Sequence, residues 1–328
     1  MDVSILMPAR NAEKYISECM DSIVCQGYVN WELIVVDDGS TDTTFEIVDR
    51  YRKRDKRIQL FRQEPLGIVS ALRLAYGKSK GKLITRMDAD DVMNQNKVET
   101  LAALLLEHGE GHVATGLVEY FSDMELGEGY QKYANWLNGL TRRGANYSGI
   151  YKECCIASPC WMVWRTDLDA CDAFKPDTYP EDYDLVFRFY RQGIFVLGSN
   201  MVLHRWRDYD SRASRTQKHY KDNSFIEIKV KYFLEIDRDA DKNLVLWGAG
   251  KRGKKVAALL GEKKVDFTWV CNNSDKIGQE IYQKRMQDSS GFEFSNKQVI
   301  VTVANSVEQE EVLQQLNKMD DCCYYLFC

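Results

Sequence analysis

Three apolar runs, each ending in polar residues, constrain the fold of this chain more than any other feature. The runs lie at residues 3–7, 33–36 and 83–84, and helical patterns separate them. Strands that alternate with helices, and that are apolar throughout, are typical of an open parallel α/β sheet. Ligands of such sheets bind outside the carboxyl ends of the strands. We therefore expect one shared edge for the residues that follow the runs, namely Pro8-Ala9-Arg10, Asp37-Asp38 and Asp88-Ala89-Asp90.

The stretch Asp88-Ala89-Asp90 has the spacing of a cation site. Side chains two residues apart in extended backbone point to the same side. Carboxylate oxygens there suit Mg²⁺ or Mn²⁺, and such a cation can hold a diphosphate. The alternative is an acidic turn that caps a helix beginning near Asn94. The neighbouring polar residues on the same predicted edge favour the cation site, with Asp90 as the metal ligand and Asp88 near ribose hydroxyls.

Asp38 and Arg10 are candidate nucleotide contacts on the same edge. A carboxylate accepts hydrogen bonds, so Asp38 suits a nucleobase N–H such as N3–H of uracil. Arg10 suits either the base or the phosphates.

A second acidic stretch, Pro180-Glu181-Asp182, has two explanations. Proline fits the first turn of a helix, and acids are favoured at a helix N-terminus. Alternatively, Asp182 is a general base that removes a proton from an attacking hydroxyl. The helix dipole lowers the pKa of a carboxyl group whereas burial raises it, and the sequence leaves that balance open.

Trp161 lies in a stretch rich in tryptophan, Ile156 to Arg165. It is either a core residue or a stacking platform for a sugar or a base.

The composition excludes several classes of protein. The chain has 328 residues, so it fits one large domain or two ordinary ones. Its 10 cysteines include no C-x-x-C pair, which indicates free thiols. The sequence has no apolar run of membrane-spanning length and no leader pattern, so we expect a cytoplasmic protein. A net charge of −5 disfavours general nucleic-acid binding, but the basic runs 50–57 and 204–218 leave open a local patch or a solvated surface.

The C-terminal third has a second α/β pattern. We expect a first domain over residues 1–220, a helical linker over 221–242 and a smaller Rossmann-like domain over 243–328. Gly248, Gly250 and Gly253 follow a short strand and precede a helix, as in a dinucleotide fingerprint. The acid expected about 20 residues further on is missing, since Cys271-Asn272-Asn273-Ser274 stands there. A structural, dimerising or acceptor-binding role is therefore favoured over NAD binding.

Four motifs in order resemble those of family 2 glycosyltransferases: V-S-I-L-M-P-A-R-N-A, V-V-D-D-G-S-T-D, M-D-A-D-D and P-E-D-Y-D-L. The resemblance covers roughly residues 3 to 215. It implies a GT-A fold and an inverting, metal-dependent transfer from a nucleotide sugar, most often a UDP-sugar. Where many members have N-x-G, this chain has Glu64-Pro65-Leu66-Gly67. By this resemblance Pro8, Arg10 and Asp38 contact the nucleotide, Asp88 and Asp90 hold the metal and diphosphate, Glu181 lies at the substrate, Asp182 is the base and His204 is a late metal ligand.

The whole architecture is also similar to a subgroup that joins this domain to a Rossmann-like unit. That subgroup includes β-1,3-N-acetylglucosaminyltransferase-like proteins and is similar to the enzyme that galactosylates queuosine in tRNA. It implies galactose as the sugar and queuosine in tRNA as the acceptor. A surface polysaccharide or lipid-linked glycan is the alternative acceptor. The competing class is a non-catalytic sensor of a nucleotide sugar or a dinucleotide. The acidic pairs Asp88/Asp90 and Glu181/Asp182 argue against it, because a protein that only binds needs no base.

Overall fold

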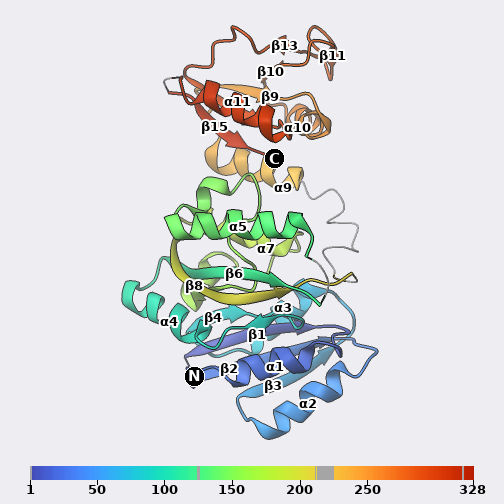
Figure 1. Cartoon of the computed structure of the whole chain (residues 1–328), viewed down its shortest axis with the longest axis vertical. Helices are drawn as coiled ribbons and strands as arrows, with labels where there is room; N and C mark the ends of the chain where they lie inside the picture. Colours follow the sequence, from blue (N-terminus) through green and yellow to red (C-terminus); the bar gives the residue numbers. More distant parts are fainter. Residues whose placement is uncertain (1, 124–125, 211, 213–224, 320) are drawn as a thin grey trace. The chain divides into compact units, whose positions relative to one another are not determined.

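The chain folds into two units, shown in the computed structural model of Figure 1. The structure describes residues 2–123, 126–210, 212, 225–319 and 321–328. Unit 1 comprises Met1–Ser148 and Cys154–Tyr220, and unit 2 comprises Gly149–Glu153 and Lys221–Cys328. The helical segment expected as a linker thus belongs to unit 2, as does the short excursion 149–153. Within the described ranges, no helix is both long and apolar enough to cross a membrane.

Unit 1 is built on an eight-stranded sheet of order β3-β2-β1-β4-β7-β6-β8-β5. The first four strands in this order pair in parallel, as the alternating pattern predicts. β7 then runs antiparallel to both β4 and β6, so the second half of the sheet is mixed. The strands are β1 (Val3–Ala9), β2 (Trp31–Asp38), β3 (Ile58–Gln63), β4 (Leu83–Arg86), β5 (Val92–Met93), β6 (His112–Phe121), β7 (Trp161–Trp164) and β8 (Phe195–Arg207).

Helices cover both faces of the parallel half, which explains why β1 and β2 are buried along their whole length. Val3, Ile5 and Met7 of β1 pack in one cluster with α1, α2 and α4. α3 packs against β1 and β2 as well, where Leu6 and Ile34 are fully buried. In the described part of unit 1 the helices are α1 (Ile16–Val24), α2 (Thr44–Arg54), α3 (Ile68–Lys78), α4 (Lys97–His108), α5 (Glu128–Arg143), α6 (Arg165–Ala170) and α7 (Glu181–Arg191), with the 3-10 turn η1 (Asn146–Gly149).

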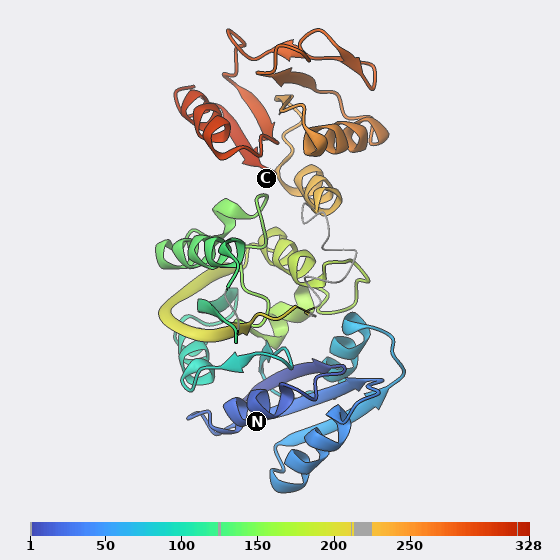
Figure 2. The ribbon, with the colours of Figure 1, turned by 45° about the vertical axis from the view of Figure 1, so that its right-hand side comes forward.

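The strand β8 is long and curved (Figure 2). It brings a distant part of the chain to the acidic stretch of residues 88–91, which follows β4. Its first half pairs in parallel with β6, and its second half also pairs with β5. In the latter pairing Met93 lies opposite His204 and Val92 opposite Arg205. Because β5 follows Asp91 directly, the end of β8 lies beside the acidic stretch.

Unit 2 is a smaller α/β unit whose five-stranded sheet, of order β13-β10-β9-β14-β15, is parallel throughout. A separate core forms around Val245, Trp247, Val270 and Phe294. Tyr151 from the excursion belongs to this unit and stacks on Phe327 at 5.3 Å. Its elements are β9 (Asn243–Trp247), β10 (Thr268–Cys271), β11 (Glu280–Ile281), β12 (Lys284–Arg285), β13 (Gln287–Asp288), β14 (Lys297–Val301), β15 (Cys323–Leu326), α9 (Ile226–Tyr232), the π-helical η3 (Phe233–Asp237), α10 (Lys251–Glu262) and α11 (Ser306–Leu316).

Candidate active site

The polar residues that follow β1, β2 and β4 lie at one edge of the sheet. These strands run in parallel, and Ala9 lies opposite Asp37 in the register. β1 ends at Ala9, β2 at Asp38 and β4 at Arg86. The structure therefore brings together the three groups of residues that the sequence predicts for this edge.

The loops after β1 and β2 hold each other through reciprocal hydrogen bonds. The backbone N–H of Asn11 donates to Ser40 Oγ at 3.0 Å, and that of Thr41 donates to Asn11 Oδ1 at 2.9 Å. In the same way Glu13 N–H donates to Asp42 Oδ2, and Thr43 N–H donates to Glu13 Oε2. Side-chain oxygens thus satisfy amides near the start of both helices. Neither loop has its full set of hydrogen bonds without the other.

Asp38 is held rigidly at the end of β2. Its Oδ1 accepts from Gln63 Nε2 at 2.7 Å and from Leu66 N–H at 2.9 Å, while Oδ2 accepts from Gly67 N–H at 2.9 Å. A carboxylate has about four acceptor positions, so one is left for a ligand N–H. The turn Glu64-Pro65-Leu66-Gly67, which departs from the family pattern, is therefore the element that orients Asp38. Arg10 lies 4.0 Å from Asp38 and is half exposed, so its guanidinium can reach a ligand.

The pKa values of Asp88 and Asp90 are shifted in opposite directions because their neighbours differ. Burial opposes ionisation of Asp88, but the ion pair with Arg86 at 2.7 Å outweighs it and lowers its pKa. Burial and then the charge of Asp91 raise the pKa of Asp90 to about 6. A cation beside Asp90 would relieve this crowding of carboxylates.

The donor set fits Mg²⁺ or Mn²⁺ bound together with a diphosphate. Among the described residues, no three histidine, cysteine or acidic side chains form a complete cage for a metal. Mg²⁺ in nucleotide enzymes needs no such cage, since one or two carboxylates, substrate phosphates and water suffice. Asp88 and Asp90 are only partly buried and can supply these oxygens. Asp90 accepts from the Tyr209 hydroxyl at 2.8 Å through Oδ2 alone, so Oδ1 is available.

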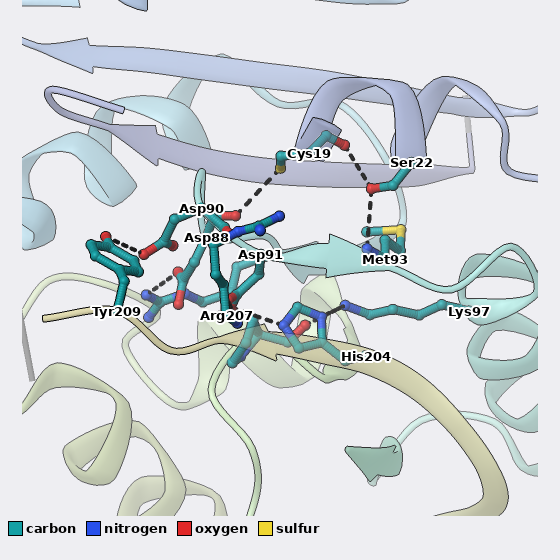
Figure 3. A network of polar contacts seen from close by, with 12 residues as sticks. Cys19, Ser22, Asp88, Asp90, Asp91, Met93, Lys97, His204, Arg207 and Tyr209 are labelled. Carbon is teal, nitrogen blue, oxygen red and sulfur yellow. Dashed lines mark hydrogen bonds and ion pairs between the residues drawn. The ribbon is translucent and has the colours of Figure 1, made fainter. Parts of the chain in front are cut away.

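His204 contacts Asp91 of the acidic loop on one side and Lys97 on the other (Figure 3). His204, Asp91 and Lys97 are all 0% exposed. His204 Nε2 lies 3.0 Å from Asp91 Oδ2, and His204 Nδ1 lies 3.3 Å from Lys97 Nζ. Burial and then the Lys97 charge hold the pKa of His204 well below its usual value. A neutral imidazole that accepts from Lys97 and donates to Asp91 keeps no lone pair for a metal. Both ring nitrogens thus have protein partners in this arrangement, and the role of His204 as a metal ligand stays a prediction.

Arg207 and Tyr209 also hold the acidic loop, although the sequence marks them only as part of a basic run. Arg207 Nε donates to the carbonyl of Asp90, and the Arg207 N–H donates to Asp91 Oδ1, both at 2.9 Å. Its guanidinium also pairs with Glu18. No local pattern indicates these roles, because each partner is more than 100 residues away in the sequence.

Asp182 lies in the first turn of α7, beside a second acid. Burial and then the charge of Glu181 raise the pKa of Asp182 to about 7, against the opposing effect of Arg86. A raised pKa is the direction that a general base needs, and this role of Asp182 stays a prediction. Glu181 Oε1 pairs with Arg86 Nη1 at 3.1 Å, and Arg86 also binds Asp88. One guanidinium therefore links α7 to the acidic stretch after β4.

Trp161 and the basic run 204–218 are the remaining candidates, and the sequence leaves two explanations open for each. Trp161 is 2% exposed in β7 and meets Phe189 edge-on, so it has the environment of a core residue and no free face for stacking. Within the basic run 204–218, Arg205 pairs with Glu119, and Arg207 binds the acidic loop. Residue 211 and residues 213–218 of that run lie outside the described residues.

The glycine turn of unit 2 is explained in part by packing. Gly248 has a φ of +123°, and a Cβ there would lie 2.6 Å from Thr302 Oγ1. A Cβ at Gly253 would meet the carbonyl of Gly248. Where a dinucleotide fold has an acid, Asn272 instead accepts from Trp247 Nε1 at 2.8 Å. Two of the three glycines are therefore required by the unit itself.

Comparison with known proteins agrees with this geometry. A model of the family described as Glycosyl transferase family 2 matches residues 4–171, just over half of the chain. The chain therefore belongs to glycosyltransferase family 2. It is 34% identical to the glycosyltransferase GlyA of Streptococcus pneumoniae serotype 4 over 98% of this chain, but spans only 46% of GlyA. It is also 34% identical to an uncharacterized glycosyltransferase of Haemophilus influenzae over 71% of this chain and 74% of that protein.

Solved structures show the same fold. TarS 1-349 of S. aureus in complex with UDP-GlcNAc superimposes with a TM-score of 0.59 and 20% identity, covering 79% of this chain and 72% of that one. A mannosyltransferase of Pyrobaculum calidifontis, in complex with GDP-Man and Mn²⁺, gives a TM-score of 0.53 at 19% identity, covering 78% and 68%. At such identities the likeness concerns the fold alone, and unit 1 has the GT-A fold.

Proposed function

We propose that unit 1 transfers a hexose from a UDP-sugar to an acceptor hydroxyl, with inversion at the anomeric carbon. The observation that carries this proposal is the joining of two acidic groups by Arg86: Asp88 of the donor stretch and Glu181 beside Asp182. Asp38 retains one acceptor position for a base N–H, which suits uracil. Pro8, Ala9 and Arg10 lie at the same edge of the sheet and are further proposed contacts to the nucleotide.

Each residue has a distinct part in the proposed transfer. Asp182 accepts the proton of the acceptor hydroxyl as its oxygen attacks the anomeric carbon. The bond from that carbon to the diphosphate breaks on the opposite side, which inverts the configuration. Asp88 and Asp90 would hold Mn²⁺ or Mg²⁺, and the cation, when bound, supplies a Lewis acid for the leaving diphosphate. Arg10 contacts the nucleotide from β1.

The test is UDP release by the purified protein over a panel of UDP-sugars with Mn²⁺, with galactose, glucose and N-acetylglucosamine donors compared. We expect release that EDTA abolishes and that Asp90→Ala and Asp182→Asn reduce by about 10²-fold or more. Asp49→Asn serves as the matched control, since Asp49 pairs with Arg52 and Lys53 of its own helix. Full turnover by Asp182→Asn would remove the assigned base.

For the acceptor we propose a saccharide of a surface polysaccharide or lipid-linked glycan. Several relatives support this by name, including the putative teichuronic acid biosynthesis glycosyltransferase TuaG of Bacillus subtilis. Arg207 is buried against the carbonyl of Asp90, and Arg205 pairs with Glu119, so these two residues give no specific support to a tRNA surface. Queuosine in tRNA remains the second candidate, on the strength of the subgroup resemblance. Stimulation of UDP release by queuosine-containing tRNA, but not by tRNA lacking queuosine, would reverse this preference.

For unit 2 we propose a structural, dimerising or acceptor-binding role. The packing needs of Gly248 and Gly253 account for most of the glycine pattern, and Asn272 stands in place of the acid of NAD sites. Fluorescence titration with NADH and the mass of the particle in solution test this. Tight NADH binding without UDP-sugar turnover would favour the sensor alternative.

A further inference from the structure

Arg86 is a buried cation between two parts of the site that are far apart in the sequence. It is the last residue of β4 and is 3% exposed. Its Nη2 lies 2.7 Å from Asp88 Oδ1, and its Nη1 lies 3.1 Å from Glu181 Oε1. The planar fork of a guanidinium can bind two carboxylates at once, which the single ammonium of a lysine does less well.

The charges around Arg86 explain why one cation there matters. Asp88, Glu181 and Asp182 gather within its reach, and all three raise its pKa against the effect of burial. Among the groups that act on Asp182, Glu181 and Asp88 favour its neutral form and Arg86 favours its ionised form. Without Arg86 the three acids would face one another with no cation between them in a partly buried site.

Stability alone does not explain the ion pairs of Arg86 with Asp88 and Glu181. Arg86 Nε and Glu181 Oε2 are buried without a hydrogen-bond partner among the described residues. Such unsatisfied groups lower the stability of a fold, and buried ion pairs are weak evidence for stability in general. Buried polar groups without partners are unusual in a fold, and their presence in these ion pairs points to a role at the site.

We infer that Arg86 is a positioning residue that couples the donor side of the site to the acceptor side. Its fork fixes Asp88 for the sugar diphosphate and Glu181, with Asp182 beside it, for the incoming hydroxyl. Loss of the fork therefore affects donor binding and proton removal together. This inference rests on the proposed function, because it assigns those two parts to Asp88 and Asp182.

The experiment compares Arg86→Gln, Arg86→Lys and Glu181→Gln with Arg188→Lys in the full chain. Arg188 is the matched control: it is buried on α7 and pairs with Asp184 at 2.8 Å, away from both Asp88 and Glu181. For each variant we would measure the dissociation constant for UDP with saturating Mn²⁺, kcat and KM for the donor, the pH profile of kcat and the melting temperature.

We expect Arg86→Gln to weaken UDP binding about tenfold and to lower kcat by about 10²-fold, since it removes a cation from both groups. The acid limb of its pH profile should move to higher pH, and that of Glu181→Gln to lower pH, because the two changes act on Asp182 with opposite sign. Arg86→Lys, which restores the charge without the fork, should recover kcat only in part. Arg188→Lys should lower the melting temperature while kcat, KM and the pH limb stay as in the wild type.

Two results would overturn the inference while leaving the proposed function intact. One is an Arg86→Gln variant with weakened UDP binding but a wild-type kcat and pH limb, which would confine Arg86 to the donor side. The other is equal behaviour of Arg86→Lys and Arg188→Lys, which would reduce Arg86 to a fold-stabilising residue. A wild-type protein that is inactive with every UDP-sugar would overturn the proposed function, and the inference with it. If Arg86→Gln does not fold, Arg86→Lys and Glu181→Gln still decide the question.

Discussion

Asp182 carries the pH dependence of the proposed reaction. Burial and Glu181 raise its pKa to about 7, so the carboxyl group is neutral below that pH and ionised above it. A general base must be ionised to accept a proton. Wild-type kcat at saturating Mn²⁺ should therefore rise with pH through about 7 and level off above it. A kcat profile recorded from about pH 5 to 9 tests this, and an acid limb near the ordinary aspartate value of about 4 would contradict it.

Variants at His204 and at Asp90 distinguish two roles, support of the acidic loop and binding of the metal. His204→Ala leaves the Asp91 carboxylate and the Lys97 ammonium buried without the ring that joins them. We expect a loss of about 3–5 kcal/mol in the free energy of unfolding, measured with urea. Asp90→Asn should instead weaken Mn²⁺ binding in the presence of UDP and change stability by less than about 1 kcal/mol. A His204→Ala protein of unchanged stability that no longer binds Mn²⁺ would instead support the predicted role of the histidine as a ligand.

Residues of the site differ in how well a sequence can reveal them. Asp38, Asp88 and Asp182 follow apolar strands or open a helix, so local pattern alone marks them. Lys97 and Arg207 cannot be found in this way, since they act through residues 107 and 117 positions away along the chain. Trp161 shows another limit: the sequence leaves a core position and a stacking platform equally open, because burial is a property of the folded sheet.

At the scale of the element, the turn of residues 64–67 after β3 orients Asp38, and Gly39, which follows β2, packs against this turn. Gly39 has a φ of +67°, and a Cβ there would lie 2.8 Å from Pro65. Gly39→Ala should therefore destabilise unit 1 by about 2 kcal/mol and weaken UDP binding, because the turn that orients Asp38 must shift. Urea denaturation and calorimetric titration with UDP measure the two effects.

The matched control for this prediction is Gly77→Ala. Gly77 lies within α3, and a Cβ there meets no atom within 4 Å. The same substitution should stabilise the protein at this position by about 0.5–1 kcal/mol, since glycine is a poor helix residue. Equal effects at the two positions would show that the turn geometry is not what holds Asp38.

The elements near the N-terminus follow from the sequence, whereas those beyond residue 90 follow less well. Apolar runs buried on both faces define β1, β2 and β4 without help from the rest of the chain. β8 has 13 residues, of which the first eight are exposed or half-buried and the last five mostly buried, so it has no continuous apolar run, and its pairing with both β6 and β5 is set only by long-range contacts. The excursion 149–153 likewise joins unit 2 through aromatic contacts that no local pattern indicates.

At the scale of the whole molecule, two separate cores predict two responses to ligand. Unit 1 and unit 2 each bury their own hydrophobic cluster. UDP with Mn²⁺ at 100 times its dissociation constant should stabilise the unit that binds it by about 2.7 kcal/mol and leave the other unchanged. Hydrogen exchange, resolved along the sequence, should show added protection in unit 1 alone. Equal protection of β9 and β14 would place nucleotide in unit 2.

The mutual hydrogen bonding of the loops after β1 and β2 has a consequence for altering donor preference. Each loop supplies the acceptors that the other's amides need, as in the exchange between Asn11 and the Ser40-Thr41 pair. A segment transplanted from a relative into one loop alone would leave unmatched amides in its neighbour. The two loops therefore depend on each other structurally. A chimera with a homologue would be expected to keep its fold only when both loops are exchanged together.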